Sequence, residues 1–281
     1  MDDVKVSIVC NTYNHEPYIR DALEGFVNQV TNFQYEVLIH DDASTDKTAD
    51  VIREYEEKYP DLIKPIYQTE NQYSQGIDFI ALYQYPRARG KYVAFCEGDD
   101  YWTDPSKLQK QYDILESHPE IDMCAHRAKN VNGVTGEACG SLGPGEQDRL
   151  LTAKEVIRGG GGFVATASLF YRGDLFNNPP SFRNILSLDY TMQILGSLKG
   201  GIFYFGDVMS VYRVQVPGSW TACMSKDYKR KIALNKKILK MLLQLNKDTG
   251  HKYWFTILTV YIKVLIRDLG YTCLMLKGDL K

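Results

Sequence analysis

The N-terminal 118 residues alternate between two hydrophobic periodicities, and this alternation constrains the fold more than any other feature of the chain. Short β-rich runs lead into turns, and the turns lead into segments whose apolar residues recur every three or four positions. The expected strands are residues 4–10, 35–40, 64–68 and 91–96, and the expected helices are residues 19–30, 48–59, 77–85 and 105–117. This order predicts an α/β fold with a mostly parallel central sheet, right-handed crossovers and flanking helices.

The pattern of residues 119–225 is less regular. We expect a strand over 121–131, a glycine-rich loop up to 147, a helix over 152–158, a strand over 163–172, a helix over 189–198 and extended segments over 201–205 and 208–216. From residue 226 the pattern is helical and basic. The sequence therefore predicts one domain over residues 1–225, with halves at 1–118 and 119–225, and a C-terminal helical extension over 226–281.

Polar and acidic side chains follow three of the expected strands. Asn11–Asn14 follow the first strand, Asp41 and Asp42 the second, and Glu97–Asp100 the fourth. Ligands of parallel sheets bind beyond the carboxyl ends of the strands. Carboxylates crowded at one edge repel each other, so we expect a cation there, and oxygen ligands suit Mg²⁺ or Mn²⁺. An acidic turn that only caps the helix beginning at Pro105 is the alternative.

The other polar segments have a structural and a functional interpretation. Ser44 or Asp46 is a typical helix N-cap, whereas Asp41 and Asp42 precede the cap and are not explained by it. A carboxylate at this position could accept the ring N–H of a uracil. A turn alone would explain the asparagines of residues 11–14, and a stacked nucleotide base would also explain Tyr13.

Three aromatic residues are candidates for ligand contact. Tyr101 and Trp102 directly follow the acidic segment, where they either form a platform for a sugar ring or pack the loop against the core. Trp220 follows a Pro-Gly-Ser turn and could lie on a lid over a bound ligand, although an ordinary turn would have the same sequence.

Three motifs carry a family resemblance. VSIVCNTYNHEPYIRDALEGFVNQ, YEVLIHDDASTDKTADVI and GKYVAFCEGDDYWTDPSKL occur in this order and resemble the nucleotide-binding half of family-2 glycosyltransferases, which are inverting enzymes with the GT-A fold. The resemblance covers about residues 4–118 and continues more loosely through LDYTMQILGSLKGG and MSVYRVQVPGSW to about residue 220. It implies a GT-A catalytic domain over 1–225, with a nucleotide-binding half (1–118) and an acceptor-binding half (119–225).

The resemblance also implies roles for single residues. Thr12, Tyr13 and Asn14 would line the nucleoside pocket, Asp42 would read the uracil, and Asp41 would support it. EGDD stands at the family's Asp-x-Asp motif, which implies Asp99, with Asp100 and Glu97, as ligands of Mn²⁺ or Mg²⁺. Asp189 matches the general base, and Arg213 is a candidate partner of the diphosphate. Leu188 and Gln215 depart from the family, which often has an acid and a histidine there.

The resemblance, together with these residues, implies a metal-dependent, inverting transferase that moves a hexosyl or N-acetylhexosaminyl group from a UDP-sugar to a carbohydrate or lipid-linked carbohydrate acceptor. The expected setting is bacterial cell-surface polysaccharide biosynthesis, with one addition per encounter. A non-catalytic sugar-nucleotide-binding protein is one alternative, left open by Glu97 and Gln215. A sugar nucleotidyltransferase ranks lower, because NTYNHEP lacks the glycine-rich basic turn of those enzymes.

Charge is distributed unevenly along the chain. The net charge is −2, but residues 226–281 hold 13 Lys and Arg against 4 Asp and Glu, a balance of +9 that leaves −11 for the preceding residues. No DNA-binding motif accompanies the basic extension, so we expect an anionic membrane surface rather than nucleic acid as its partner. Residues 253–266 are apolar apart from threonines and Lys263. This apolar segment is too short to span a bilayer, and it suits either an interfacial helix or a helix packed on the domain.

The cysteines and the N-terminal residues indicate the cellular compartment that we expect for the protein. Six cysteines are scattered without a Cys-x-x-Cys pair, and the first ten residues lack the pattern of a signal peptide. We therefore expect a cytoplasmic protein, at the inner face of the cell membrane if the extension binds lipid.

Overall fold

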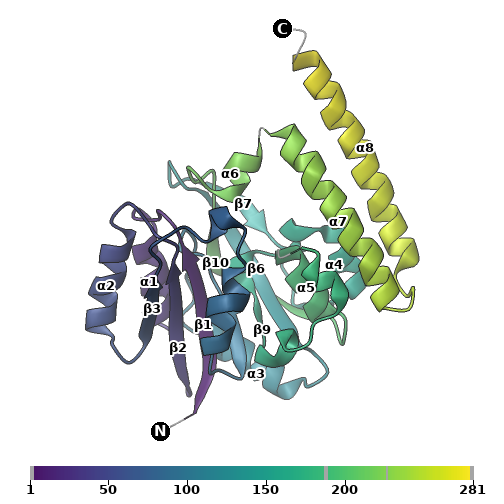
Figure 1. Ribbon diagram of the computed structural model, residues 1–281. Helices are drawn as coiled ribbons and strands as arrows, with labels where there is room; N and C mark the ends of the chain where they lie inside the picture. Colours follow the sequence, from purple (N-terminus) through teal and green to yellow (C-terminus); the bar gives the residue numbers. More distant parts are fainter. Residues whose placement is uncertain (1–2, 187–188, 226, 279–281) are drawn as a thin grey trace.

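The computed structural model describes residues 3–186, 189–225 and 227–278, which are built around one large sheet (Figure 1). The described strands are β1 (Val4–Thr12), β2 (Gln34–Asp41), β3 (Ile63–Tyr67), β4 (Tyr92–Phe95), β5 (Tyr101–Trp102), β6 (Met123–Asn132), β7 (Ala138–Leu142), β8 (Arg149–Leu151), β9 (Phe170–Arg172) and β10 (Ile202–Val214). The described α-helices are α1 (Ile19–Val27), α2 (Thr48–Lys58), α3 (Lys107–Ser117), α4 (Ala153–Gly159), α5 (Asp189–Ser197), α6 (Trp220–Ser225), α7 (Tyr228–Asp248) and α8 (Trp254–Gly278).

The sheet has two parallel parts joined by an antiparallel strand. β3, β2, β1 and β4 lie side by side and parallel, and β6 and β10 also pair in parallel. β9 runs antiparallel between β4 and β6 and connects the two parts. The order is β3-β2-β1-β4-β9-β6-β10-β5, with β7 paired to β6 and β8 paired to β10. The predicted mostly parallel sheet with flanking helices is therefore confirmed.

The register of the parallel strands brings the polar segments to one edge. Thr12 at the end of β1 pairs with Asp41 at the end of β2. Beyond β4, the Gly98 N–H donates to the Asn11 carbonyl at 2.9 Å. A Cβ atom on Gly98 would lie 2.6 Å from the Thr12 hydroxyl oxygen, so the acidic turn packs directly on the end of β1. A larger residue than glycine at position 98 would push this turn away from the sheet.

The strand predicted over residues 163–172 is wrong for most of its length. Within this range only β9 pairs as a strand, and 3₁₀ turns occupy Gly161–Phe163 and Thr166–Ser168. One carbonyl of this stretch bonds to a side chain instead of a neighbouring strand, because Trp102 Nε1 donates to Ala167 at 2.9 Å.

The helix predicted over residues 77–85 is also wrong in form. The chain makes a π-helical turn at Ile80–Gln84 and a 3₁₀ turn at Tyr85–Arg87. Pro86 has no backbone N–H and cannot continue an α-helix. The wider turn points the buried Gln84 amide into the sheet, where Nε2 donates to the carbonyl groups of Cys10 and Leu38.

Two smaller differences concern the second half. The loop predicted up to residue 147 contains β7, which pairs antiparallel with β6. The extended segments predicted over 201–205 and 208–216 form one strand, β10, whose register against β6 is irregular between Phe205 and Val208. A β-bulge of this kind joins two extended runs without breaking the strand.

Helices cover both faces of the sheet. α1, α2 and α3 pack on one face, with Phe26 and Leu115 in their core. α4, α5, α7 and α8 pack on the other face, where Met241, Leu245 and Ile257 belong to the same apolar cluster as the sheet residues. No described helix is both long and apolar enough to cross a bilayer. Through the residues of this cluster the extension packs on the domain, and the boundary at residue 225 stays a prediction.

Trp102 belongs to the core rather than to a ligand surface. The residue is 3% exposed, and its ring packs edge-on against Phe26 with centroids 4.9 Å apart. The Lys107 ammonium group lies 3.8 Å from the centre of the indole ring. Of the two alternatives for Trp102, packing against the core is therefore the one found, because β5 pairs with β10 and strand alternation turns this side chain inward.

We expect Trp102→Ala to lower the free energy of unfolding by about 3–5 kcal/mol, because truncation leaves a cavity and unpairs the Ala167 carbonyl. Tyr101→Ala, at the adjacent and only partly buried position, is the matched control and should cost clearly less. Urea unfolding followed by circular dichroism measures both variants. Equal losses would contradict the assignment of Trp102 to the core.

Candidate active site

Hydrogen bonds hold together the two turns that follow β1 and β2. Asn14 has a φ of 55° and accepts the Thr45 N–H through Oδ1 at 2.7 Å, while its own N–H donates to Ser44 Oγ at 2.9 Å. The His15 N–H donates to Thr48 Oγ1 at 2.8 Å. Asparagine adopts left-handed backbone more readily than most residues. The structure thus gives Asn14 a bridging position between the turns, and its predicted nucleoside contact stays a prediction.

Thr12 and Tyr13 differ sharply in exposure. The Tyr13 side chain is 43% exposed at the edge of the sheet, as a base-stacking position requires. Thr12 is 2% exposed, and its Oγ1 has no hydrogen-bond partner among the described residues. Thr12 therefore packs beneath the surface at this edge of the sheet, and Tyr13 is the residue of this pair that a nucleotide base could reach.

Asp41 and Asp42 are both buried below the edge. Asp42 accepts the backbone N–H groups of Gln72 at 2.7 Å and Tyr73 at 3.0 Å, which fixes the loop after β3. Each oxygen of Asp42 keeps a second lone pair for a ligand N–H. Asp41 accepts a hydrogen bond from Ser44 Oγ, and burial raises the pKa of Asp41. Asp41 therefore supports the turn beside Asp42, and the contact of Asp42 with uracil stays a prediction.

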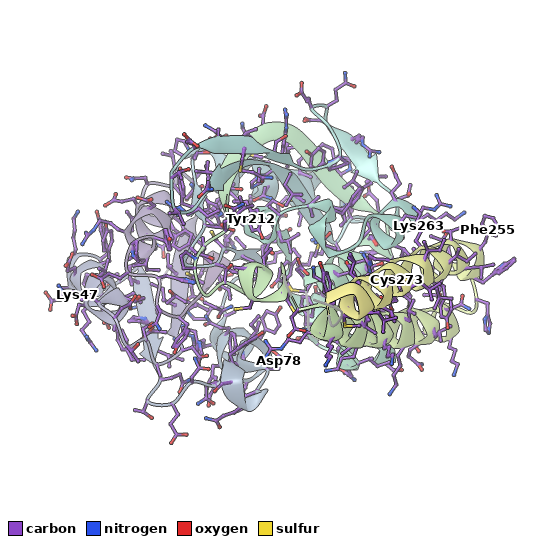
Figure 2. All side chains as sticks on the ribbon, turned by 90° about the horizontal axis from the view of Figure 1, so that it is seen from above. Lys47, Asp78, Tyr212, Phe255, Lys263 and Cys273 are labelled. Atoms are coloured by element: carbon purple, nitrogen blue, oxygen red, sulfur yellow. The ribbon has the colours of Figure 1, made fainter. Side chains whose placement is uncertain are left out.

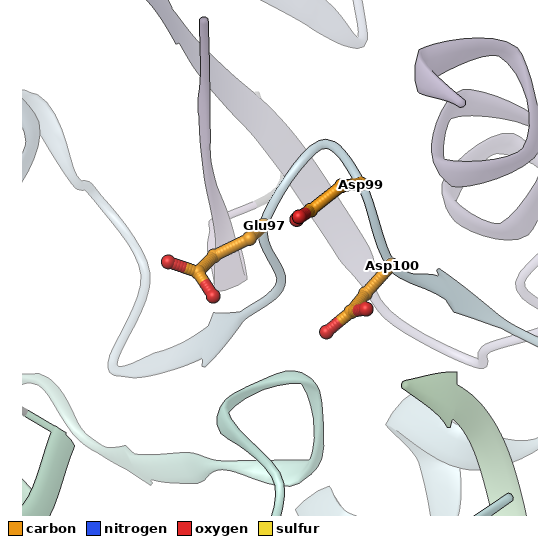
Figure 3. Close-up of side chains that lie close together, drawn as sticks. All are labelled: Glu97, Asp99 and Asp100. Carbon is orange, nitrogen blue, oxygen red and sulfur yellow. The ribbon is translucent and has the colours of Figure 1, made fainter. Parts of the chain in front are cut away.

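Glu97, Asp99 and Asp100 form the acidic turn after β4 (Figure 3). One carboxylate oxygen from each lies within 4.8 Å of the others. Asp100 is 1% exposed, and its Oδ1 accepts the Arg213 backbone N–H at 2.8 Å. Its Oδ2 is buried, and no described residue donates a hydrogen bond to it. Crowded oxygen ligands with one unpaired buried oxygen fit a hard divalent cation such as Mg²⁺ or Mn²⁺.

The crowding disfavours ionisation of these carboxyl groups. Burial, followed by the charges of Asp99 and Asp189, raises the pKa of Glu97 to about 8. Burial, again with the charge of Asp99, raises the pKa of Asp100 well above its usual range. A cation bound by the turn would favour the charged forms, so metal binding and proton release are coupled at this site.

Arg213 on β10 braces the acidic turn. Its Nη1 donates to the Asp99 carbonyl at 2.9 Å, and its Nη2 pairs with Asp21 of α1. The guanidinium group also lies over the rings of Tyr101 and Tyr18, at 4.4 Å and 5.1 Å from their centres. Arg213 is thus a positioning residue in the described state. Its contact with a diphosphate, and a sugar contact of Tyr101, stay predictions.

Asp189 begins α5 and lies near the acidic turn, since its charge contributes to the raised pKa of Glu97. Asp189 Oδ1 accepts the Tyr190 N–H at 2.6 Å, and burial raises the pKa of Asp189 to about 6. A Cβ atom on Gly161 would lie only 3.1 Å from Asp189 Oδ1, so a side chain at position 161 would crowd the carboxylate. The fold therefore brings Asp189 to the site, and its role as base stays a prediction.

Three other positions complete the comparison with the sequence. Gln215 is exposed, has a φ of 62° and accepts a hydrogen bond from Asn132 Nδ2 at 2.9 Å. Leu188 and the Trp220 side chain lie outside the described residues, although the Trp220 backbone begins α6. The lid contact of Trp220 stays a prediction.

Sequence reasoning missed three residues of the site. His15 Nε2 lies 3.9 Å from Asp99 Oδ2, and burial lowers the pKa of His15, which favours the neutral ring. The Tyr212 hydroxyl lies 3.3 Å from Thr221 Oγ1 on α6. Asp21, the partner of Arg213, stands in the first turn of α1, where an acid is typical of any helix, so no signal marks it.

We expect Mn²⁺ and Mg²⁺ to bind the acidic turn more weakly as the pH falls below about 8, because Glu97 must lose its proton. Titration calorimetry in two buffers of different ionisation enthalpy measures the released proton. Asp99→Asn should weaken binding by at least about tenfold. Asp61→Asn, an exposed acid elsewhere, is the control, and equal affinities for the two variants would argue against this site.

Comparison with known sequences agrees with the motifs. Residues 7–176, more than half of the chain, match the model of the family described as Glycosyl transferase family 2. An uncharacterized protein of Mycobacterium tuberculosis is 38% identical over 218 residues, and the match covers 76% of this chain but only 60% of that relative. The putative teichuronic acid biosynthesis glycosyltransferase TuaG of Bacillus subtilis is 36% identical over 110 residues, 39% of this chain and 41% of the relative.

Comparison with solved structures concerns the fold. S. aureus TarS 1-349 in complex with UDP-GlcNAc superposes with a TM-score of 0.60 at 21% identity, covering 90% of this chain and 73% of that one. The mannosyltransferase PcManGT from Pyrobaculum calidifontis, in complex with GDP-Man and Mn²⁺, gives a TM-score of 0.59 at 15% identity, covering 100% and 82%. The predicted GT-A fold is confirmed, and with the family match over residues 7–176 the chain belongs to glycosyltransferase family 2.

Proposed function

We propose that this glycosyltransferase is an inverting enzyme that moves a hexosyl or N-acetylhexosaminyl group from a UDP-sugar to a hydroxyl group of a carbohydrate or lipid-linked carbohydrate. One observation carries the proposal. An exposed aromatic ring, Tyr13, and a turn of three carboxylates lie at one edge of the sheet, and a fourth carboxylate, Asp189 at the start of α5, is near enough for its charge to raise the pKa of Glu97. Such a site can hold a nucleotide, a cation and an acceptor at the same time.

The donor would bind across the ends of β1, β2 and β4. Tyr13 would stack on the base, and Asp42, held in place by two backbone N–H groups, would accept the uracil ring N–H. Asp99 and Asp100, with Glu97, would hold Mn²⁺ or Mg²⁺, which supplies positive charge to the departing diphosphate. The UDP-GlcNAc bound by TarS and the Mn²⁺ bound by PcManGT support this assignment.

Asp189 would act as the general base. It accepts the proton of the acceptor hydroxyl while the acceptor oxygen attacks the anomeric carbon on the side opposite UDP. The bond from the anomeric carbon to the phosphate oxygen breaks, and UDP leaves with the bonding electrons. Attack opposite the leaving group inverts the anomeric centre.

The similarity to TuaG supports a polysaccharide of the cell surface as the product class. All six cysteines are free, which agrees with a reducing compartment. The proposal sets transfer in the cytoplasm, with one sugar added per encounter.

We expect Asp189→Asn to reduce transfer by about a hundredfold or more, because the amide cannot accept the acceptor proton. A thermal-shift panel of nucleotide-sugars with Mn²⁺ identifies the donor, and UDP release from that donor with added acceptor glycans measures turnover. The control is Asp174→Asn, an exposed acid of the same half.

Asp189→Asn should still bind the donor, which separates loss of the base from loss of the fold. Unchanged turnover in Asp189→Asn would remove this residue from the mechanism. Donor binding by the wild type without any turnover would instead support a sugar-nucleotide-binding protein.

The pH dependence of the transfer rate should reflect the ionisation of Asp189. Because its pKa is raised to about 6, Asp189 is ionised above that pH and loses its capacity to accept a proton below it. We expect kcat at saturating metal and donor to fall about tenfold per unit as the pH drops below 6. A profile that stays flat down to pH 5 would contradict the assignment.

A further inference from the structure

α8 carries an apolar stripe that nothing in the described chain covers. Trp254, Leu258, Ile262, Leu265, Leu269 and Leu276 follow each other at helical spacing and lie within one narrow arc of the helix. Each is between 42% and 67% exposed. Figure 2 shows Phe255, at the start of the same helix, projecting away from the body of the protein. Isolated apolar residues are common on protein surfaces, whereas a continuous stripe along a helix marks an interaction surface.

The opposite side of α8 is fixed to the domain. Tyr253, Ile257 and Val264 are each no more than 4% exposed. Asp268 and Arg267 bond to Asn235 of α7, which holds the two helices together as a hairpin. α8 therefore presents its stripe outward along its length and cannot leave the domain to insert end-on.

The charges of α7, the helix that packs on α8, indicate which kind of partner covers the stripe. The exposed side of α7 carries Lys229, Lys236, Lys237, Lys240 and Lys247, and none of these forms an ion pair with a described residue. No acidic residue lies within the stripe, and the only described acid of α8, Asp268, faces Asn235. A second copy paired through the stripe would carry the same lysines on its own α7 and would add positive charge to the pair. An anionic lipid surface would instead attract them.

We propose that the α7–α8 hairpin is a peripheral membrane-binding surface, in which α8 lies in the plane of an anionic bilayer with its stripe among the acyl chains and the lysines of α7 contact lipid headgroups. A helix with one apolar face beside a basic face binds the interface in this way. Tyr228 at the start of α7 stacks on Tyr271 of α8, with ring centroids 5.3 Å apart. The C-terminal part of the stripe therefore lies near the first turn of α7.

This placement has a consequence for the acceptor, which rests on the proposed function. α7 follows α6, and α6 contacts β10 through Tyr212 and Thr221 beside the acidic turn. The end of α8 that carries Leu269 and Leu276 therefore lies on the same side of the molecule as the site (Figure 1). A lipid-linked acceptor held in the bilayer would present its sugar to Asp189 from this side.

Vesicle co-sedimentation of the full chain tests the surface without any assay of transfer. We expect binding to equimolar phosphatidylglycerol and phosphatidylcholine vesicles and at least tenfold weaker binding to phosphatidylcholine alone. Ile262→Glu with Leu269→Glu should lower binding to the anionic vesicles at least tenfold. Val30→Glu with Val134→Glu, two equally exposed apolar positions on the domain, is the matched control and should leave binding unchanged.

The lysines are tested in the same way. Lys236→Glu with Lys240→Glu should weaken binding to the anionic vesicles at least tenfold, whereas Lys47→Glu with Lys58→Glu, at the N-cap and the last residue of the distant helix α2, should not (Figure 1). Equal effects of the two pairs would show attraction by net charge alone and would overturn the assigned surface.

Tryptophan emission gives a readout that needs no charged substitution in the stripe. Trp254 is exposed and should shift its emission to shorter wavelength when anionic vesicles are added, and Trp254→Phe should remove this shift. Failure of the wild type to bind either vesicle would overturn the proposal. So would a dimer in sedimentation velocity that dissociates in Ile262→Glu with Leu269→Glu, since a second copy would then cover the stripe.

Discussion

The backbone and side chain of Arg213 connect segments that lie far apart in the sequence. Its N–H donates to Asp100, and its guanidinium group reaches the Asp99 carbonyl and Asp21 on α1. The acidic turn after β4 is thereby fixed between the first helix and the last long strand. Charge-assisted bonds of this kind fix orientation as well as distance. The geometry of the turn thus depends on β10, although its carboxylates are supplied by the other half of the domain.

The buried carboxylates of the acidic turn lower the stability of the folded protein. Burial and mutual repulsion raise the pKa values of Glu97 and Asp100, and the Thr12 hydroxyl and Asp100 Oδ2 are buried without described partners. In a core selected only for stability, such groups would be paired or replaced by apolar ones. Their presence at the carboxyl ends of parallel strands agrees with a site that is completed by a cation and a phosphate ligand.

The parallel half of the fold could be predicted from the sequence because its signals are local. Each strand of β1 to β4 is a short apolar run, and each polar segment directly follows its strand, so order along the chain determines position in space. The prediction over residues 163–172 failed because short turns there bond to Trp102, which lies about sixty positions away. The same reason hid Asp21 and the bracing contacts of Arg213. The inward side of Trp102 follows from pairing with β10, which no local pattern reports.

Opposite charge in the two parts of the chain follows from opposing demands on one surface. Residues 1–225, which include the carboxylates of the site, have a balance of −11, and this charge would repel both an anionic donor and an anionic lipid surface. The extension, with +9, offsets this charge beside the site. Burial, followed by Cys223 and Glu97, raises the pKa of Tyr73, whereas the charge of Arg230 on α7 lowers it. The ring therefore lies within reach of a carboxylate of the acidic turn and of a positive charge of the extension.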